Sequence, residues 1–191
     1  MPILLFTIVV FVSVLIHELG HAVTARRFGW PPHITLYHFG GLASYQPTYG
    51  YTPARRVLIS LAGPGAGFVL FGIIYAAEQY LIRNHVAVTP VVGYLIVQFK
   101  FVNLWWGLLN LLPIYPLDGG QVAEQVCRKI NPYRGMENTF KLGIIVAVIV
   151  AIFAWQRMGQ TYMALMFLFL AFNNYQFLEQ TRGRGGPGSP W

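Results

Sequence analysis

Residues 3–27, ILLFTIVVFVSVLIHELGHAVTARR, decide the fold class of this chain. From Ile3 to Ile16 the side chains are almost all apolar. A helix that crosses a bilayer needs about 20 mostly apolar residues. The stretch ends at Arg26 and Arg27, and basic residues of this kind collect on the cytoplasmic side of a span. We therefore expect residues 3–27 to form a transmembrane helix that carries His17, Glu18 and His21 inside the bilayer.

The composition of the whole chain agrees with a membrane protein. Hydrophobic residues make up 55% of the 191 residues and charged residues only 10%, whereas an average soluble domain has roughly 25% charged residues. The net charge is +7, but the basic residues flank apolar segments, which argues against a nucleic-acid-binding patch. The single cysteine, Cys127, excludes an internal disulfide.

Five stretches are apolar and long enough to suggest spans, and they cover residues 3–27, 55–81, 91–112, 140–156 and 160–178. The predicted fold is an all-α polytopic membrane protein with about five transmembrane helices. Residues 113–139 form a polar segment between the third and fourth spans. We expect one domain over residues 1–180 and a disordered tail over residues 181–191, which are rich in Gly, Pro and Arg.

A short β-hairpin is predicted between the first two spans. Ile34, Leu36 and His38 alternate with other side chains, Gly40 and Gly41 offer a turn, and a second short run ends at Tyr45. If this hairpin enters the bilayer, protein must cover its edges, because unpaired backbone groups are costly in lipid.

The distribution of basic residues predicts the orientation. With the N-terminus outside, the outer loops receive only Arg83 and Arg157, and Lys100 lies within the third span. The cytoplasmic side receives the other basic residues, Arg26, Arg27, Arg55, Arg56, Arg128, Lys129, Arg134, Lys141, Arg182 and Arg184. This bias predicts five spans with the N-terminus outside and the C-terminus in the cytoplasm.

His17, Glu18 and His21 match the pattern H-E-x-x-H. On a helix, residues four apart lie on one face, so both imidazoles can reach one metal ion while Glu18 handles a proton. Ionisable residues inside a span are costly and normally indicate a function. The structural alternative is a pair of buried histidines that are hydrogen-bonded to neighbouring helices.

Asp118 is the candidate for a third ligand, which a catalytic zinc with an open position needs. It follows two prolines and precedes Gly119 and Gly120, so we expect unwound backbone there instead of a regular helix. With a rise of about 1.5 Å per residue, the histidines lie roughly 7–14 Å before Arg26, and the third span ends toward the same membrane side. The two motifs can therefore meet near the cytoplasmic surface.

The intramembrane H-E-x-x-H, together with N-x-x-P-x-x-P-x-D-G-G from Asn110 to Gly120, resembles the site-two protease family of intramembrane zinc metalloproteases. Ala62-Gly63-Pro64 and the run Phe39-Gly40-Gly41 are also similar to segments of that family. The resemblance covers most of residues 1–130 and fits a small member without a PDZ or nucleotide-sensing domain. Many relatives carry an Asn where this chain has Gly67, and the last two spans have no motif that matches.

The resemblance implies a zinc metalloendopeptidase, with Zn²⁺ bound by His17, His21 and Asp118. Glu18 would be the catalytic acid and base, and Asn110 would stabilise the oxyanion or bind substrate. Phe39, Gly40 and Gly41 would contact the substrate if the hairpin pairs with an unwound stretch of it, or would only cover the site. The substrates would be single-span membrane proteins or signal peptides, cleaved by intramembrane proteolysis toward the cytoplasmic side.

Two other functions remain open from the sequence. An inactive family member could bind transmembrane partners, although His17, Glu18, His21 and Asp118 are all present. A small zinc transporter would need polar residues along a path through both leaflets. Lys100 is the main ionisable residue away from the cytoplasmic half, and it has either a role in water access or a structural partner such as Glu78 or a carbonyl. Gly63 and Gly67 have the spacing of close helix packing, with a catalytic role as the alternative.

Overall fold

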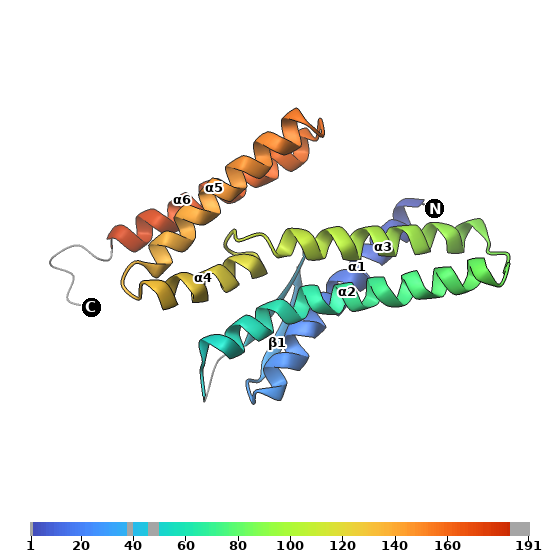
Figure 1. The fold of residues 1–191 in the computed structure, drawn as a ribbon, viewed down its shortest axis with the longest axis horizontal. Helices are drawn as coiled ribbons and strands as arrows, with labels where there is room; N and C mark the ends of the chain where they lie inside the picture. Colours follow the sequence, from blue (N-terminus) through green and yellow to red (C-terminus); the bar gives the residue numbers. More distant parts are fainter. Residues whose placement is uncertain (1, 38–39, 46–49, 184–191) are drawn as a thin grey trace. The chain divides into compact units, whose positions relative to one another are not determined.

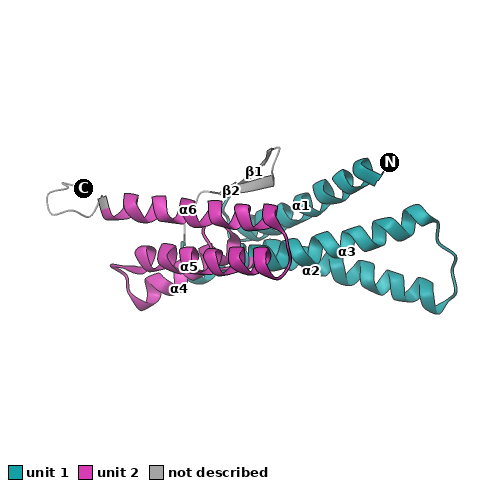
Figure 2. Cartoon of the chain, turned by 90° about the horizontal axis from the view of Figure 1, so that it is seen from above, with its two compact units in different colours: residues 1–110 teal, residues 111–191 magenta. Residues whose placement is uncertain are grey.

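The structure is a computed structural model that describes residues 2–37, 40–45 and 50–183. The chain divides into two compact units, residues 1–110 and residues 111–191 (Figure 2). Among the described residues, the first unit contains three long helices and two short strands, and the second contains three helices.

The helices of the first unit are α1 (Pro2–Arg27), α2 (Pro53–Arg83) and α3 (Pro90–Asn110) (Figure 1). The start of α2 has a clear local cause. Thr52 lies at the N-cap and its side chain accepts a hydrogen bond from the Arg55 N–H at 3.2 Å. Pro53 follows at the first helical position, where its missing N–H costs nothing. Helix α2 is therefore two residues longer at each end than the predicted span of residues 55–81.

One face of α1 is buried and packs against α2 and α3. A buried polar contact joins two of these helices, since Asn103 Nδ2 of α3 donates to Ser13 Oγ of α1 at 2.9 Å. Just beyond the end of α1, Trp30 is fully buried with Ala25 and Ile59. The residues of the buried face of α1 are Val9, Ser13, Val14, His17, Glu18, His21, Ala22 and Ala25.

Strands β1 (Pro32–Tyr37) and β2 (Gly40–Tyr45) pair in an antiparallel register from Pro32 opposite Tyr45 to Tyr37 opposite Gly40. The two strands also lie against α1. The expected hairpin covered residues 34–45, and its connection at residues 38–39 lies outside the described part of the chain.

The second unit begins with an irregular segment, residues 111–117, and continues into α4 (Asp118–Ile130). The prediction that the prolines and glycines prevent a regular helix is correct before Asp118 and wrong after it. Gly119 and Gly120 lie in the first turn of α4, because the close approach of that turn to the preceding backbone leaves no room for a Cβ atom.

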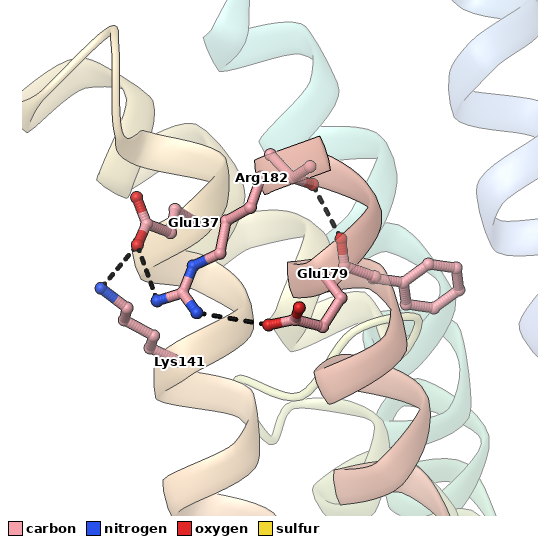
Figure 3. A network of polar contacts seen from close by, with 6 residues as sticks. Glu137, Lys141, Glu179 and Arg182 are labelled. Carbon is pink, nitrogen blue, oxygen red and sulfur yellow. Dashed lines mark hydrogen bonds and ion pairs between the residues drawn. The ribbon is translucent and has the colours of Figure 1, made fainter. Parts of the chain in front are cut away.

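Helices α5 (Gly135–Gln156) and α6 (Thr161–Gly183) form a hairpin of two adjacent helices (Figure 2). A charged network joins the start of α5 to the end of α6 (Figure 3). Glu137 accepts from Lys141 at 2.7 Å and from Arg182 at 3.3 Å, and Arg182 also reaches Glu179 at 3.3 Å. This end of the hairpin is therefore polar, while most of the rest of both helices is apolar.

Four of the described helices, α1, α2, α3 and α5, are long and apolar enough to cross a membrane. The prediction of five spans is not confirmed, because α6 is not among them. Its apolar run is interrupted by Asn173, Asn174 and Gln176. Helix α6 continues to Gly183, into the first residues of the predicted tail, and the single domain and the disordered tail stay predictions. Residues 184–191 of that tail lie outside the described residues.

Candidate metal centre

His17 and His21 lie one turn apart on the buried face of α1. Their Nε2 atoms are 3.2 Å apart, and the planes of the two rings are inclined by 81°. Two nitrogen ligands at about 2.0–2.1 Å from a tetrahedral zinc ion lie about 3.3–3.4 Å apart. The spacing of the two nitrogens is therefore close to that of two ligands of one ion.

A backbone carbonyl of α2 fixes the orientation of His21. His21 Nδ1 lies 2.7 Å from the carbonyl oxygen of Ile59. Because a carbonyl oxygen can only accept, Nδ1 carries the proton and the lone pair of the ring is on Nε2, as metal binding requires. This contact lies beside a break in the helical hydrogen-bond ladder, since Pro64 has no N–H to donate to the carbonyl of Ser60.

Gly63 of α2 lies directly against both imidazoles. A Cβ atom at this position would overlap Nε2 of His21 and would lie 2.9 Å from Nε2 of His17. The glycine therefore leaves a space next to the two nitrogen atoms that any other residue would fill. The sequence pattern favoured packing over catalysis for Gly63, and the packing here is against the histidines themselves.

Asp118 is the first residue of α4 and is buried, with 7% of its surface exposed. His17, His21 and Asp118 form a group that can hold a metal ion, because one ligand atom of each lies within 4.8 Å of the others. Two imidazole nitrogens and a carboxylate oxygen are donors that zinc accepts at a site with one open position. The chemistry of the donor set, the ring tautomer of His21 and the space at Gly63 all fit such an ion.

The other predicted site residues are placed as follows. Glu18 is buried on α1, with 7% of its surface exposed. Asn110 is the last residue of α3, and its side chain donates to the carbonyl of Trp106 at 2.9 Å. Gly40 and Gly41 open β2, whereas Phe39 lies outside the described residues. The catalytic and substrate-binding roles of these residues stay predictions.

Lys100 has a structural partner, which was one of the two predicted alternatives. Its ammonium group pairs with the Glu78 carboxylate and links α3 to α2, with 22% and 21% of the two side chains exposed. The Ile59 carbonyl was not predicted from the sequence. No side-chain pattern could reveal it, because the acceptor belongs to the main chain.

Comparisons with known proteins assign the family. The sequence profile described as Peptidase family M50 matches residues 5–88 and 82–155. The chain belongs to this family. It is 35% identical over 147 residues to a putative zinc metalloprotease of Synechocystis sp., which covers 75% of this chain and 35% of the relative. It is 29% identical over 174 residues to a zinc metalloprotease of Methanocaldococcus jannaschii, with 88% of this chain and 48% of the relative covered.

A solved structure supports the same family. The site-2 protease from Methanocaldococcus jannaschii superposes with a TM-score of 0.64 and 25% identity, over 91% of this chain and 77% of that chain. The resemblance to the site-two proteases is thereby confirmed. With this family and four apolar helices of sufficient length, the chain is a multi-pass membrane protein. It spans only 35% and 48% of the length of the two curated relatives.

Proposed function

We propose that this chain is a zinc-dependent membrane endopeptidase that hydrolyses peptide bonds of transmembrane or membrane-associated proteins. The observation that supports this most directly is the buried group of His17, His21 and Asp118, with Glu18 next to the first histidine in sequence. The relatives described as zinc metalloproteases point to the same chemistry.

The proposed roles follow from the chemistry of each side chain. His17, His21 and Asp118 would hold Zn²⁺, which when bound supplies a Lewis acid that polarises the scissile carbonyl and makes water more acidic. Glu18 accepts a proton from the attacking water and delivers it to the nitrogen of the leaving amine. Asn110 is the proposed donor to the carbonyl oxygen as negative charge develops there. To do so, its amide must give up or share its bond to the Trp106 carbonyl.

The proposed topology places this chemistry on the cytoplasmic side, with the N-terminus outside and the C-terminus inside. The bias of the basic residues supports this orientation. The hairpin of α5 and α6 supports a fifth span, because α6 runs back beside α5 and has 23 residues against 22. Intramembrane cleavage of single-span proteins or signal peptides is the proposed use of such a site.

Replacing Glu18 by Gln tests the proposed chemistry. The amide keeps the size of the side chain but cannot accept the proton of water, so cleavage of a model single-span substrate should fall by at least about 100-fold. The zinc content of the purified protein should remain that of wild type, since Glu18 is not a proposed ligand. The measurements are substrate cleavage in detergent or liposomes and metal analysis of the same samples.

Glu179→Gln is the matched control, because Glu179 is exposed on α6 and, among the described residues, its carboxylate pairs only with Arg182. It should cleave at the wild-type rate. Chelation should abolish wild-type cleavage, and added Zn²⁺ should restore it. A wild-type protein that binds zinc but cleaves nothing would favour a family member that only binds partners. Full activity in Glu18→Gln would remove Glu18 from its role.

A further inference from the structure

The last helix, α6, contains a fully buried polar side chain that the proposed chemistry does not use. Asn174 has 0% of its surface exposed. Its Nδ2 donates to the carbonyl of Leu170 on its own helix at 2.8 Å and to the carbonyl of Tyr115 at 2.6 Å. Tyr115 belongs to the irregular segment that leads into Asp118. Asn174 therefore bonds a helix of the hairpin to the backbone three residues before the proposed metal ligand.

The Tyr115 ring is held by the same hairpin. Its centroid is 5.6 Å from that of Phe140 on α5 and 5.5 Å from that of Phe177 on α6, and both contacts are edge-to-face. The Phe140 and Phe177 rings are stacked on each other at 5.5 Å. Edge-to-face pairs of this kind contribute about 0.5–1.5 kcal/mol each beyond the apolar area that they bury. Both the ring and the carbonyl of Tyr115 are thus fixed by α5 and α6.

The fixed peptide at Tyr115 also supports the first turn of α4. A Cβ atom at Gly120 would overlap the Ile114 carbonyl carbon and the Tyr115 nitrogen, so Gly120 lies directly on the Ile114–Tyr115 peptide, which adjoins the Tyr115 carbonyl that Asn174 binds. Gly119 lies equally close to the carbonyls of Leu111 and Leu112. Because the first turn of α4 rests on this backbone, a shift of the Tyr115 peptide would move Asp118 as well.

The bond of Asn174 is not explained by stability alone. Asn174 Oδ1 is buried and has no hydrogen-bond partner in the described part of the chain. An unsatisfied buried polar atom costs about 1–3 kcal/mol. Gly143 of α5 makes room for this amide, since a Cβ atom there would overlap Asn174 Oδ1. The chain thus retains a polar side chain that gains two hydrogen bonds at Nδ2 and carries the cost of an unsatisfied Oδ1.

We infer that Asn174 is a positioning residue for the metal centre, which orients Asp118 through its hydrogen bond to the Tyr115 carbonyl. This inference rests on the proposed function, because it takes Asp118 as a metal ligand. It assigns a role to α6, the helix whose sequence carries no motif of the family. Asn174 acts through the backbone of residues 115–118 and does not itself touch the ion or the substrate.

Asn174→Leu tests the inference, because Leu has the same branched arrangement of side-chain heavy atoms as Asn but no hydrogen-bond donor. Removal of an outer partner of a metal ligand typically weakens metal binding about 10–100-fold. We expect the affinity of the full-length chain for zinc, measured by competition with a chromogenic chelator, to fall at least about tenfold. The visible absorption of bound Co²⁺ should change as well. The unfolding temperature of the metal-free protein should change by no more than about 4 °C, because loss of the donor to the Tyr115 carbonyl is opposed by removal of the unsatisfied Oδ1.

Asn173→Leu is the matched control, since it makes the same substitution one residue earlier, at a partly exposed position of α6. It should bind zinc and Co²⁺ as wild type does. Gly143→Ala displaces the Asn174 amide from the other side and should weaken zinc binding in the same direction. Because alanine has a higher helix propensity than glycine, a loss of zinc affinity in Gly143→Ala cannot come from a weaker α5 helix.

Equal zinc affinities for Asn174→Leu and Asn173→Leu would overturn the inference. So would a loss of affinity that comes with a fall of more than about 10 °C in the unfolding temperature of metal-free Asn174→Leu, since the role would then be structural. A wild-type chain that binds no zinc would instead refute the proposed function. Because wild type is measured first, this result is distinguished from a failure of the inference about Asn174.

Discussion

Gly63 is the residue at which helix packing and the candidate metal centre coincide. It lies on α2, yet the nearest atoms to its missing side chain are the ring atoms of His17 and His21 on α1. A glycine in a helix normally costs about 1 kcal/mol relative to alanine. At this position any other side chain would collide with the imidazoles of two proposed ligands.

Gly63→Ala should therefore reduce zinc affinity strongly, because the new methyl group must push the imidazoles or the helices apart. We expect a loss of at least about tenfold in affinity, together with a corresponding loss of cleavage. Gly65→Ala is the matched control on the same helix, since a Cβ atom there meets nothing within 4 Å. It should keep zinc and gain up to about 1 kcal/mol of helix stability. Wild-type zinc affinity in Gly63→Ala would contradict the proposed location of the ion.

At the scale of helices, the α2–α3 pair contains an ion pair in an apolar setting. Lys100 and Glu78 are each about four-fifths buried, and each neutralises the charge of the other. Removing one partner of such a pair leaves a charge that has no compensation, whereas removing both does not.

We expect Lys100→Met alone to destabilise the protein by about 1–3 kcal/mol. The double variant Lys100→Met/Glu78→Gln should recover most of that loss, and a double-mutant cycle of unfolding in detergent measures the coupling. The exposed pair of Arg182 and Glu179, with half of each side chain exposed, is the control and should show about 0.5 kcal/mol or less. Equal losses in the single and double variants would show that Lys100 has a role apart from this pair.

Helices α4 and α6 show where sequence patterns fall short. The long apolar runs and the H-E-x-x-H motif were sufficient to predict α1, α2, α3 and α5, because their signal is local. Helix α4 was missed because Gly119 and Gly120 disfavour a helix locally, and only their contact with the backbone of residues 111–115 explains them. The role of Asn174 also depends on a distant contact, because its partner, the Tyr115 carbonyl, lies 59 residues earlier in the chain. No local pattern could predict it.

At the scale of the whole molecule, the proposed topology makes α6 a fifth span despite its polar residues. The test uses single cysteines in a Cys127→Ser background, with a membrane-impermeant thiol reagent applied to intact cells. Met158→Cys, between α5 and α6, should be labelled from outside. Tyr133→Cys, between α4 and α5, and Thr181→Cys, near the end of α6, should be labelled only after the cells are opened. Labelling of Thr181→Cys in intact cells would show that α6 does not cross.

The hydrogen bond between His21 Nδ1 and the Ile59 carbonyl has a consequence for genetics. Every amino acid supplies a carbonyl oxygen, so no codon change at position 59 deletes the acceptor. A saturation library at that position would report only on the fit of the side chain beside Trp30 and Ala25. Such a screen would therefore not detect the Ile59 carbonyl, although this group sets the tautomer of a proposed ligand. Detecting its role requires a substitution that changes the path of the α2 backbone, for example at Pro64.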